Sequence, residues 1–168
     1  KRARKAPKRF RVALTGARTF LGERFIQAME SDPACEHILA MDIARPNSAR
    51  SKTRYERVDL THPSADEQMA ALLKRDSVDT LLHLAFLAFP SHASSWAHEV
   101  EAIGSLYVMN AAAEAKVRKV VLASTMMVYG AYPDNPNYLT EEHPLRGMSS
   151  SRWVMDKVSA EKELRRLK

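Results

Sequence analysis

A glycine turn between a short apolar strand and a helix constrains this chain more than any other feature. Residues 11–15 (RVALT) form a short apolar run, and residues 20–29 carry apolar side chains at helical spacing. Between them Gly16 permits a tight turn, and Gly22 falls in the opening turn of the helix. A second apolar run, residues 37–42, ends in a carboxylate. The sequence therefore predicts a strand, a tight turn, a helix and a second, parallel strand.

The rest of the chain repeats this alternation of apolar runs and helical patterns. Continuous apolar strands between helices favour a parallel sheet covered on both faces. We predict an α/β fold, a Rossmann-type doubly wound parallel sheet of strand order 3-2-1-4-5, with residues 1–10 as a flexible basic tail and residues 11–168 as one domain. The further expected elements are strands at 55–58, 80–84 and 119–124, a helix that starts near Ser64 with a capping box at 64–67, and helices at 96–115 and 151–167.

Charge and cysteine content limit which partners and which cellular compartment are expected. The net charge is +6, but seven basic residues lie within the first 11 positions, so the remainder carries −1. This disfavours a nucleic-acid partner, with a tail that binds RNA or DNA as the last-ranked alternative. Cys35 is the only cysteine, which excludes an internal disulfide and favours a reduced, cytoplasmic location. Residues 80–89 are about half as long as a membrane span, and the histidines lack metal-ligand spacing.

The glycine turn and Asp42 together predict a dinucleotide site. Asp42 lies 20 residues after Gly22, which is the spacing of a carboxylate that accepts hydrogen bonds from the adenosine ribose hydroxyls. The helix N-terminus offers free amides and a favourable dipole to the pyrophosphate. A carboxylate at this position repels a 2′-phosphate, so NAD is expected rather than NADP, although Arg18 and Arg45 nearby keep NADP as an alternative. The alternative is that Asp42 is only a carboxylate at the end of a strand and binds no ribose.

Six motifs, met in order along the chain, carry a resemblance to a known family. They are TGARTFLG at residues 15–22, Asp59-Leu60, LHLA at residues 82–85, STMMVYG at residues 124–130, Thr140-Glu141-Glu142 with Pro144, and Lys157 with Glu161. With these motifs the chain resembles the extended short-chain dehydrogenase/reductase family, the NAD-dependent epimerases and dehydratases of nucleotide sugars. The resemblance covers almost everything after the tail.

The resemblance implies an oxidoreductase or epimerase that transfers a hydride between NAD and a hydroxyl or ketone of a nucleotide sugar or similar small molecule. It implies that Thr125, next to Ser124, orients the reacting hydroxyl and that Lys157 binds the nicotinamide ribose. It also implies a homodimer formed through the helices at 96–115 and 151–167. The cofactor-binding residues it implies are Gly16, Arg18, Thr19, Phe20, Leu21, Gly22, Asp42, Asp59, Leu60, Leu84, Ala85 and Lys157, and it implies no metal ligand.

Several positions depart from the family pattern. Trp153 stands four residues before Lys157, where the family has its catalytic tyrosine, and an indole N–H donates a hydrogen bond but does not shuttle a proton. Thr19 replaces the middle glycine of the turn, where its Cβ is expected to crowd the pyrophosphate or to force a positive φ. Glu101 and Tyr107 replace asparagines that are usual in the long helix.

These departures keep a second function open, a non-catalytic dinucleotide-binding sensor or assembly protein that has lost turnover. The Asp-Glu pair of dehydratases is Met-Met at residues 126–127, which argues against sugar 4,6-dehydration. Tyr129 and Tyr138 are the nearby phenols available to replace the missing tyrosine. His83 is expected to be a buried, hydrogen-bonded strand residue rather than a base. The family continues beyond the active-site helix with further strands and a substrate-binding part, which we expect this chain to lack.

Overall fold

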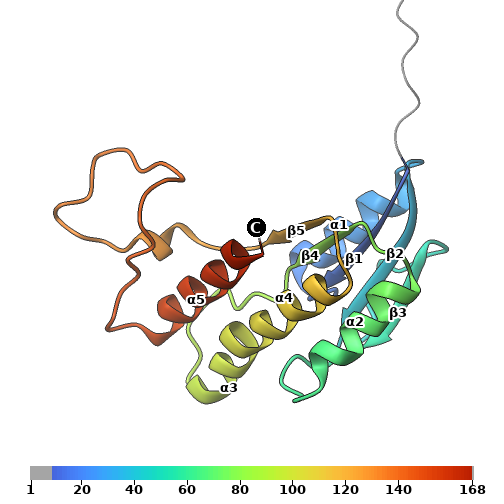
Figure 1. The fold of residues 1–168 in the computed structure, drawn as a ribbon, viewed down its shortest axis with the longest axis horizontal. Helices are drawn as coiled ribbons and strands as arrows, with labels where there is room; N and C mark the ends of the chain where they lie inside the picture. Colours follow the sequence, from blue (N-terminus) through green and yellow to red (C-terminus); the bar gives the residue numbers. More distant parts are fainter. Residues whose placement is uncertain (1–8, 168) are drawn as a thin grey trace, which may run out of the picture.

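Five parallel strands form one sheet in the computed structural model, which describes residues 9–167 (Figure 1). Their order is β3-β2-β1-β4-β5, and each neighbouring pair is parallel. This confirms the predicted α/β Rossmann-type fold and its strand order. The strands are β1 (Phe10–Thr15), β2 (Cys35–Asp42), β3 (Thr53–Arg57), β4 (Thr80–His83) and β5 (Lys119–Leu122).

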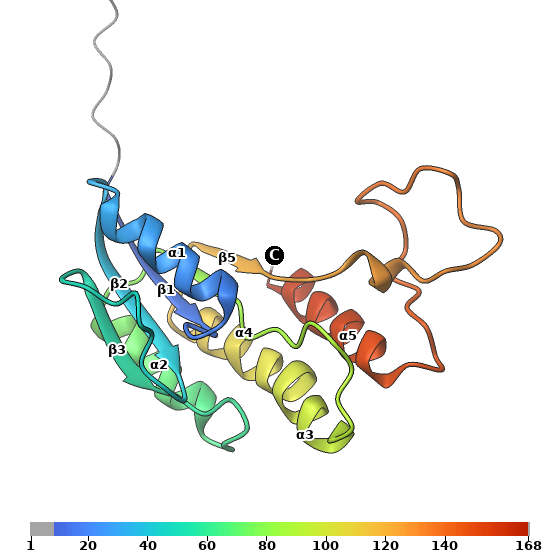
Figure 2. The ribbon, with the colours of Figure 1, turned by 180° about the vertical axis from the view of Figure 1, so that it is seen from behind.

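Helices cover both faces of the sheet, as parallel crossovers require. Helix α1 packs on one face (Figure 2). There Ile26 and the inward side chains of β1 and β2 form a buried cluster. Helices α2 and α4 pack on the opposite face around Met69, Leu73 and Val108. The helices are α1 (Phe20–Ser31), α2 (Ala65–Arg75), α3 (Ser94–His98), α4 (Gly104–Glu114) and α5 (Arg152–Arg166).

The long helix expected at 96–115 is not a regular α-helix. A π-helical segment, η1 (Glu99–Ile103), separates α3 from α4. A π turn inserts one extra residue into the helical repeat and changes which side chains face inward. As a result, the charged side chain of Glu101 is buried, with 4% of its surface exposed.

The capping box predicted at residues 64–67 is wrong. Ser64 does precede α2, but its side chain makes no capping hydrogen bond to the helix. Its hydroxyl is 2.9 Å from Nδ1 of His62 instead. A short local bond to the preceding turn competes here with the cap, as serine side chains often do.

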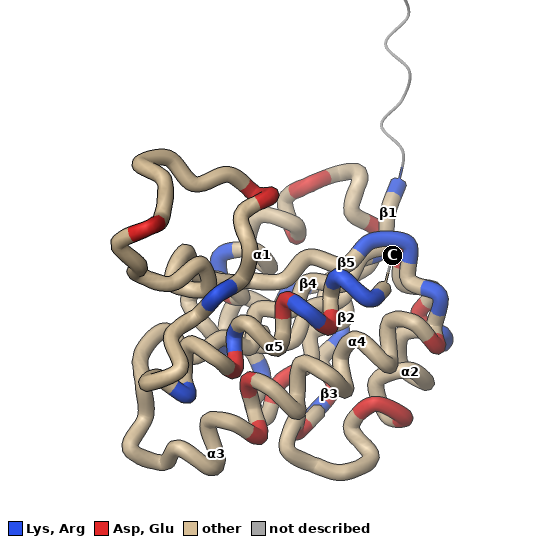
Figure 3. Tube along the Cα trace, turned by 60° about the vertical axis from the view of Figure 1, so that its left-hand side comes forward, with Lys and Arg blue, Asp and Glu red and all other residues tan. Residues whose placement is uncertain are grey.

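The charged residues of the described chain do not gather on one element. Basic and acidic residues are interspersed along the trace in Figure 3. Residues 1–8, on which most of the predicted basic tail falls, lie outside the described residues. Across residues 9–167, no helix combines the length and the apolar character that crossing a bilayer demands.

Candidate functional site

The turn between β1 and α1 requires glycine at two positions because backbone approaches closely there. Gly16 has φ +69°, and a Cβ on it would lie 2.4 Å from the backbone nitrogen of Ala85. A Cβ on Gly22 would lie 2.3 Å from the carbonyl oxygen of Gly16. Real Cβ atoms do not approach backbone so closely, so both positions exclude side chains. The turn therefore packs against the segment after β4 and against its own helix.

The expectation that Thr19 forces a positive φ is wrong. Thr19 has φ −67° and extended backbone, and it is the N-cap of α1. Its hydroxyl accepts from the Gly22 N–H at 3.1 Å and donates to the Gly16 carbonyl at 2.8 Å. An N-cap residue needs no glycine-like backbone, and a threonine hydroxyl satisfies an otherwise orphan amide. The substitution therefore gives the turn a helix cap.

A pocket of about 200 Å³ opens at the carboxyl ends of β1, β2 and β3. Asp42 stands on its rim and accepts from the Arg18 backbone N–H at 2.9 Å. The Arg18 guanidinium turns away and donates to Asn47 at 3.0 Å and to the Arg45 carbonyl at 3.3 Å. The pocket is lined by Thr15, Gly16, Met41, Asp42, Ile43, Val58, Asp59, Leu60, Thr61, Ala85, Trp96 and Val100.

Asp59 is the second carboxylate of this pocket. The Thr61 hydroxyl and backbone N–H donate to Asp59 at 2.7 and 2.9 Å. These hydrogen bonds outweigh partial burial and lower the pKa of Asp59, so the pocket carries a stable negative charge. Five predicted positions, Gly16, Asp42, Asp59, Leu60 and Ala85, thus meet in one pocket. Sequence reasoning missed Trp96 and Val100, which come from the start of the long helix and carry no motif.

Three other predicted cofactor-binding side chains lie elsewhere. The side chain of Leu84 packs in the core beneath α1, where 7% of its surface is exposed. Phe20 and Leu21 are 74% and 51% exposed at the N-terminus of α1. Their backbone amides belong to the first turn of the helix, whereas the Thr19 hydroxyl accepts from Gly22. At these two positions the backbone rather than the side chain would bind an anion.

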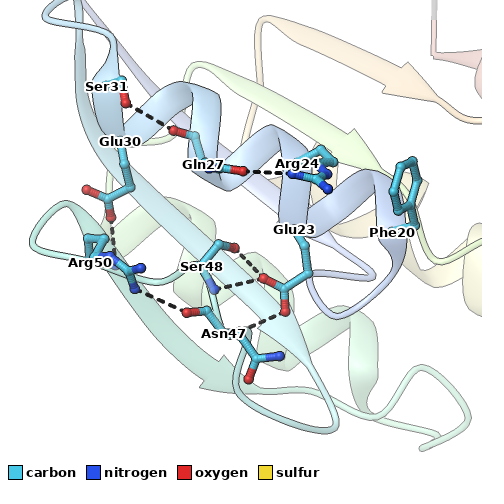
Figure 4. A pocket seen from close by; sticks show the side chains of 9 residues that line it. All are labelled: Phe20, Glu23, Arg24, Gln27, Glu30, Ser31, Asn47, Ser48 and Arg50. Atoms are coloured by element: carbon cyan, nitrogen blue, oxygen red, sulfur yellow. Dashed lines mark hydrogen bonds between the residues drawn. The ribbon is translucent and has the colours of Figure 1, made fainter.

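A wider hollow on the outer side of α1 is lined by side chains of this helix and of the loop after β2 (Figure 4). The Glu23 carboxylate accepts from the backbone amides of Asn47 and Ser48 at 2.7 and 2.8 Å. Glu30 accepts from the Arg50 amide at 3.0 Å in the same way. Burial opposes the charge of Glu23, but hydrogen bonds from Ser48 and Asn47 outweigh it and lower the pKa. These carboxylates hold the loop after β2 against α1.

His83 is the last residue of β4, next to the glycine turn that follows β1. Nδ1 is 2.6 Å from the Thr15 hydroxyl, and Nε2 is 2.9 Å from the Ser105 hydroxyl. Burial lowers the pKa of His83 to about 4, and the positive charge of Lys157 acts in the same direction. The prediction of a buried, hydrogen-bonded strand residue is confirmed.

Lys157 lies on the other side of β4, in a closed cluster. Its ammonium donates to Glu101 at 2.8 Å, and the two side chains are 2% and 5% exposed. Burial lowers the pKa of Lys157, while the Glu101 carboxylate acts in the opposite direction. The alternative of a solvated helix lysine is therefore wrong. The Trp153 indole N–H donates to the Leu87 carbonyl at 2.9 Å.

The predicted hydroxyls Ser124 and Thr125 follow β5. The Ser124 hydroxyl donates to the Glu161 carboxylate of α5. Thr125 caps the 3-10 turn η2 (Met126–Tyr129) and accepts from the Met127 amide at 3.4 Å. Both hydroxyls are thus at least partly engaged in local hydrogen bonds. The chain then continues into a long loop, residues 130–150, which projects from the rest of the structure (Figures 1 and 2).

The phenol nearest to these hydroxyls in sequence is Tyr129. Its hydroxyl donates to the Glu141 carboxylate at 3.3 Å. Burial and the negative charge of Glu141 raise the pKa of Tyr129, which keeps the phenol protonated. Tyr138 is 89% exposed on the projecting loop. No group of three or more potential metal ligands occurs among the described residues.

A glycine turn and a helix N-terminus after β1, with carboxylates at the end of β2 and after β3, are the arrangement of a dinucleotide-binding Rossmann fold. The NAD dependent epimerase/dehydratase family matches residues 12–168, and the chain belongs to this family. The resemblance predicted from the motifs is thereby confirmed.

The chain is also similar to known proteins and to solved structures. Uncharacterized proteins of Mycobacterium bovis and Mycobacterium tuberculosis are 28% identical over 163 residues, which cover 93% of this chain and 42% of theirs. The chain thus spans less than half the length of these relatives. The UDP-glucuronic acid 4-epimerase of Bacillus cereus in complex with NAD matches with TM-score 0.72 and 20% identity, over 94% of this chain and 52% of the enzyme.

Two further solved structures share the fold. The enzyme WbmG of Bordetella bronchiseptica in complex with NAD matches with TM-score 0.77 and 17% identity, over 96% of this chain and 51% of that enzyme. DesIV of Streptomyces venezuelae, a dTDP-glucose 4,6-dehydratase with NAD and TYD bound, matches with TM-score 0.73 and 23% identity, over 93% and 51% of the two chains. At these identities the likeness establishes the fold.

Proposed function

We propose that this chain binds NAD across the carboxyl ends of its strands, with adenosine in the pocket beside Asp42 and Asp59. The observation that carries the proposal is the pocket itself, which joins the glycine turn after β1 to the carboxylates at the end of β2 and after β3. Asp42 accepts one backbone hydrogen bond of good geometry and keeps acceptor sites for ribose hydroxyls. Family membership and the NAD-bound neighbours support the choice of ligand.

Several groups fit the adenosine and pyrophosphate part. The backbone amides of Phe20 and Leu21 belong to the first turn of α1, and a helix N-terminus favours a phosphate. Asp42 disfavours a 2′-phosphate, and the Arg18 guanidinium is engaged with Asn47 and Arg45. We therefore propose NAD rather than NADP.

The nicotinamide part fits less well. Lys157, which the family resemblance assigns to the nicotinamide ribose, is paired with Glu101 and 2% exposed. The residue that would act as proton donor and acceptor is Trp153, whose N–H is used by Leu87. Trp153 therefore supplies no proton transfer at that end.

Hydride exchange with a hydroxyl or ketone of a nucleotide sugar or similar small molecule is our first candidate activity for the protein. It rests on family membership and on the Thr125 hydroxyl, which the resemblance assigns to the reacting hydroxyl. A non-catalytic NAD-binding sensor or assembly protein is the second candidate. The buried Lys157–Glu101 pair and the hydrogen bond from Trp153 to Leu87 favour it.

The test measures binding and turnover separately. Calorimetric titration with NAD⁺ and NADP⁺ is expected to give tighter binding of NAD⁺, and binding of neither overturns the site. A panel of nucleotide sugars then reports turnover. Loss of a measurable activity in Trp153→Ala would exclude the non-catalytic candidate, whereas activity that appears only in Trp153→Tyr would support it.

We also propose the homodimer that the family resemblance implies. Helices α4 and α5, which contain most of the two predicted interface segments, lie side by side (Figures 1 and 2). Trp96, at the start of the first segment, is 51% exposed. Sedimentation at several concentrations tests this proposal, and a monomer at every concentration contradicts it.

A further inference from the structure

The segment after β4 is held through both backbone polar groups of Leu87. The Leu87 N–H donates to the Glu101 carboxylate, and the Leu87 carbonyl accepts from the Trp153 indole at 2.9 Å. Glu101 belongs to η1 and Trp153 to α5. Two separate helices therefore fix the same residue, and with it the position of the side chain that precedes it.

That side chain is Phe86, and its ring covers the ammonium group of Lys157. The Lys157 nitrogen lies 3.6 Å from the centroid of the Phe86 ring and 5.0 Å from that of Trp153. The same nitrogen is 2.8 Å from Glu101. Because the ammonium is paired on one side and covered by an aromatic face on the other, it has no direct path to a sugar hydroxyl.

The space beside this cluster is too small for a ribose. The cavity bounded by Phe86, Ser124 and Lys157 has a volume of about 10 Å³, which is near the minimum that holds one water molecule. The pocket at Asp42 measures about 200 Å³. A dinucleotide that crosses the sheet at the switch point places one half on each side, so its two halves meet very different surroundings.

From this contrast we propose that Phe86 is a specificity-determining residue that closes the nicotinamide end of the crevice. The chain then recognises its nucleotide through the adenosine diphosphate part alone. NAD⁺, ADP-ribose and ADP bind with similar affinity, because each presents the same adenine, ribose and pyrophosphate to Gly16 and Asp42. This inference rests on the proposed function, since it places a nucleotide in the pocket beside Asp42.

The test compares three nucleotides on the full chain and on two matched variants. Calorimetry with NAD⁺, ADP-ribose and ADP is expected to give dissociation constants within about threefold of one another. In Phe86→Ala, NAD⁺ is expected to tighten about tenfold relative to ADP, because the uncovered ammonium gains a charged hydrogen bond to the ribose. Phe89→Ala is the control, since Phe89 lies in the same segment and is 81% exposed. ADP binding by each variant reports that it is folded.

A second measurement on the native chain needs no variant. Saturation-transfer NMR with bound NAD⁺ is expected to show strong transfer to the adenine protons and weak transfer to the nicotinamide protons. NAD⁺ binding more than about tenfold tighter than ADP, or equal transfer to both rings, overturns the inference and leaves the proposed function intact. An unchanged ratio of NAD⁺ to ADP affinity in Phe86→Ala, with ADP still bound, also overturns it. Failure of all three nucleotides to bind overturns the proposed function itself.

Discussion

The two regions proposed to hold the two halves of NAD are built differently. The proposed adenosine end consists of backbone and strand termini: the Gly16 turn and the carboxylates Asp42 and Asp59, around an open pocket. The proposed nicotinamide end consists of long side chains from three segments, with Lys157 paired to Glu101 beneath Phe86.

This difference shows why one end follows the family pattern and the other departs from it. The turn is marked by glycines at fixed spacing, because Gly22 meets the backbone of Gly16 and Gly16 meets the backbone of Ala85, and neither place has room for a Cβ. A cluster of side chains depends on partners far apart in sequence, and Glu101 lies 56 positions from Lys157. One substitution at either partner changes the whole cluster.

The largest expected effect comes from breaking the buried Lys157–Glu101 pair at the proposed nicotinamide end. Glu101→Leu leaves the Lys157 ammonium buried and unpaired, so the free energy of unfolding should fall by about 3–5 kcal/mol. Adding Lys157→Met should recover part of this loss, because the double variant buries no charge. Urea denaturation of the two single variants and the double variant measures the coupling.

The exposed pair Lys74–Glu114 is the matched control for this prediction. Its side chains are 50% and 59% exposed, so Glu114→Leu should cost less than about 1 kcal/mol. Equal losses for Glu101→Leu and Glu114→Leu would contradict the view that the nicotinamide end is closed by a buried charge.

The next effect concerns His83, which lies between the two ends. The unfolded chain protonates this histidine near its ordinary pKa of 6.5, whereas the folded chain does so only at about 4. Between these values the unfolded state binds more protons, so stability falls as the pH falls. The native chain should lose about 3 kcal/mol more than His83→Gln across this range.

Measuring both proteins across the same range isolates His83. Carboxylates with lowered pKa values, such as Glu23 and Asp59, also reduce stability at low pH. Their contribution is common to both proteins and cancels in the difference. Parallel curves of unfolding free energy against pH would show that His83 is not buried in its neutral form.

A smaller effect is expected on dinucleotide affinity at the pocket beside Asp42. Asp42→Asn keeps an acceptor for the Arg18 amide but loses the charge that holds the ribose hydroxyls, so NAD⁺ should bind about tenfold more weakly. The affinity for NADP⁺ should fall less, because the substitution removes the repulsion between Asp42 and the 2′-phosphate. Glu67→Gln, an exposed site outside the pocket, is the control. Equal losses for both dinucleotides would contradict the role of Asp42 in selectivity.

The smallest effect concerns the loop after β2, which Glu23 holds against α1. Glu23→Gln weakens the bonds from the Asn47 and Ser48 amides and should cost about 1 kcal/mol. Hydrogen exchange should accelerate at these two amides. Arg24→Gln, an exposed change on the same helix, serves for comparison. Unchanged exchange in Glu23→Gln would show that the loop is held by other contacts.

Most of the fold could be predicted from the sequence because its signals are local. Apolar runs, glycine positions and helical spacing specify strands and helices within short windows, and right-handed parallel crossovers restrict their order. The errors were local as well. Thr19 was expected to crowd the pyrophosphate or to force a positive φ, but it caps α1 at φ −67°; Ser64 bonds to His62 where a cap was expected.

The sequence by itself determined the sheet order, the glycine turn and the replacement of the family's tyrosine by Trp153. Only the tertiary structure decided that Lys157 is buried and that Phe86 covers it. The π segment η1 carries Glu101 inward, and the contacts of Leu87 join it to α5. A charge on a helix looks solvated in a sequence, and its burial depends on which distant segments pack over it.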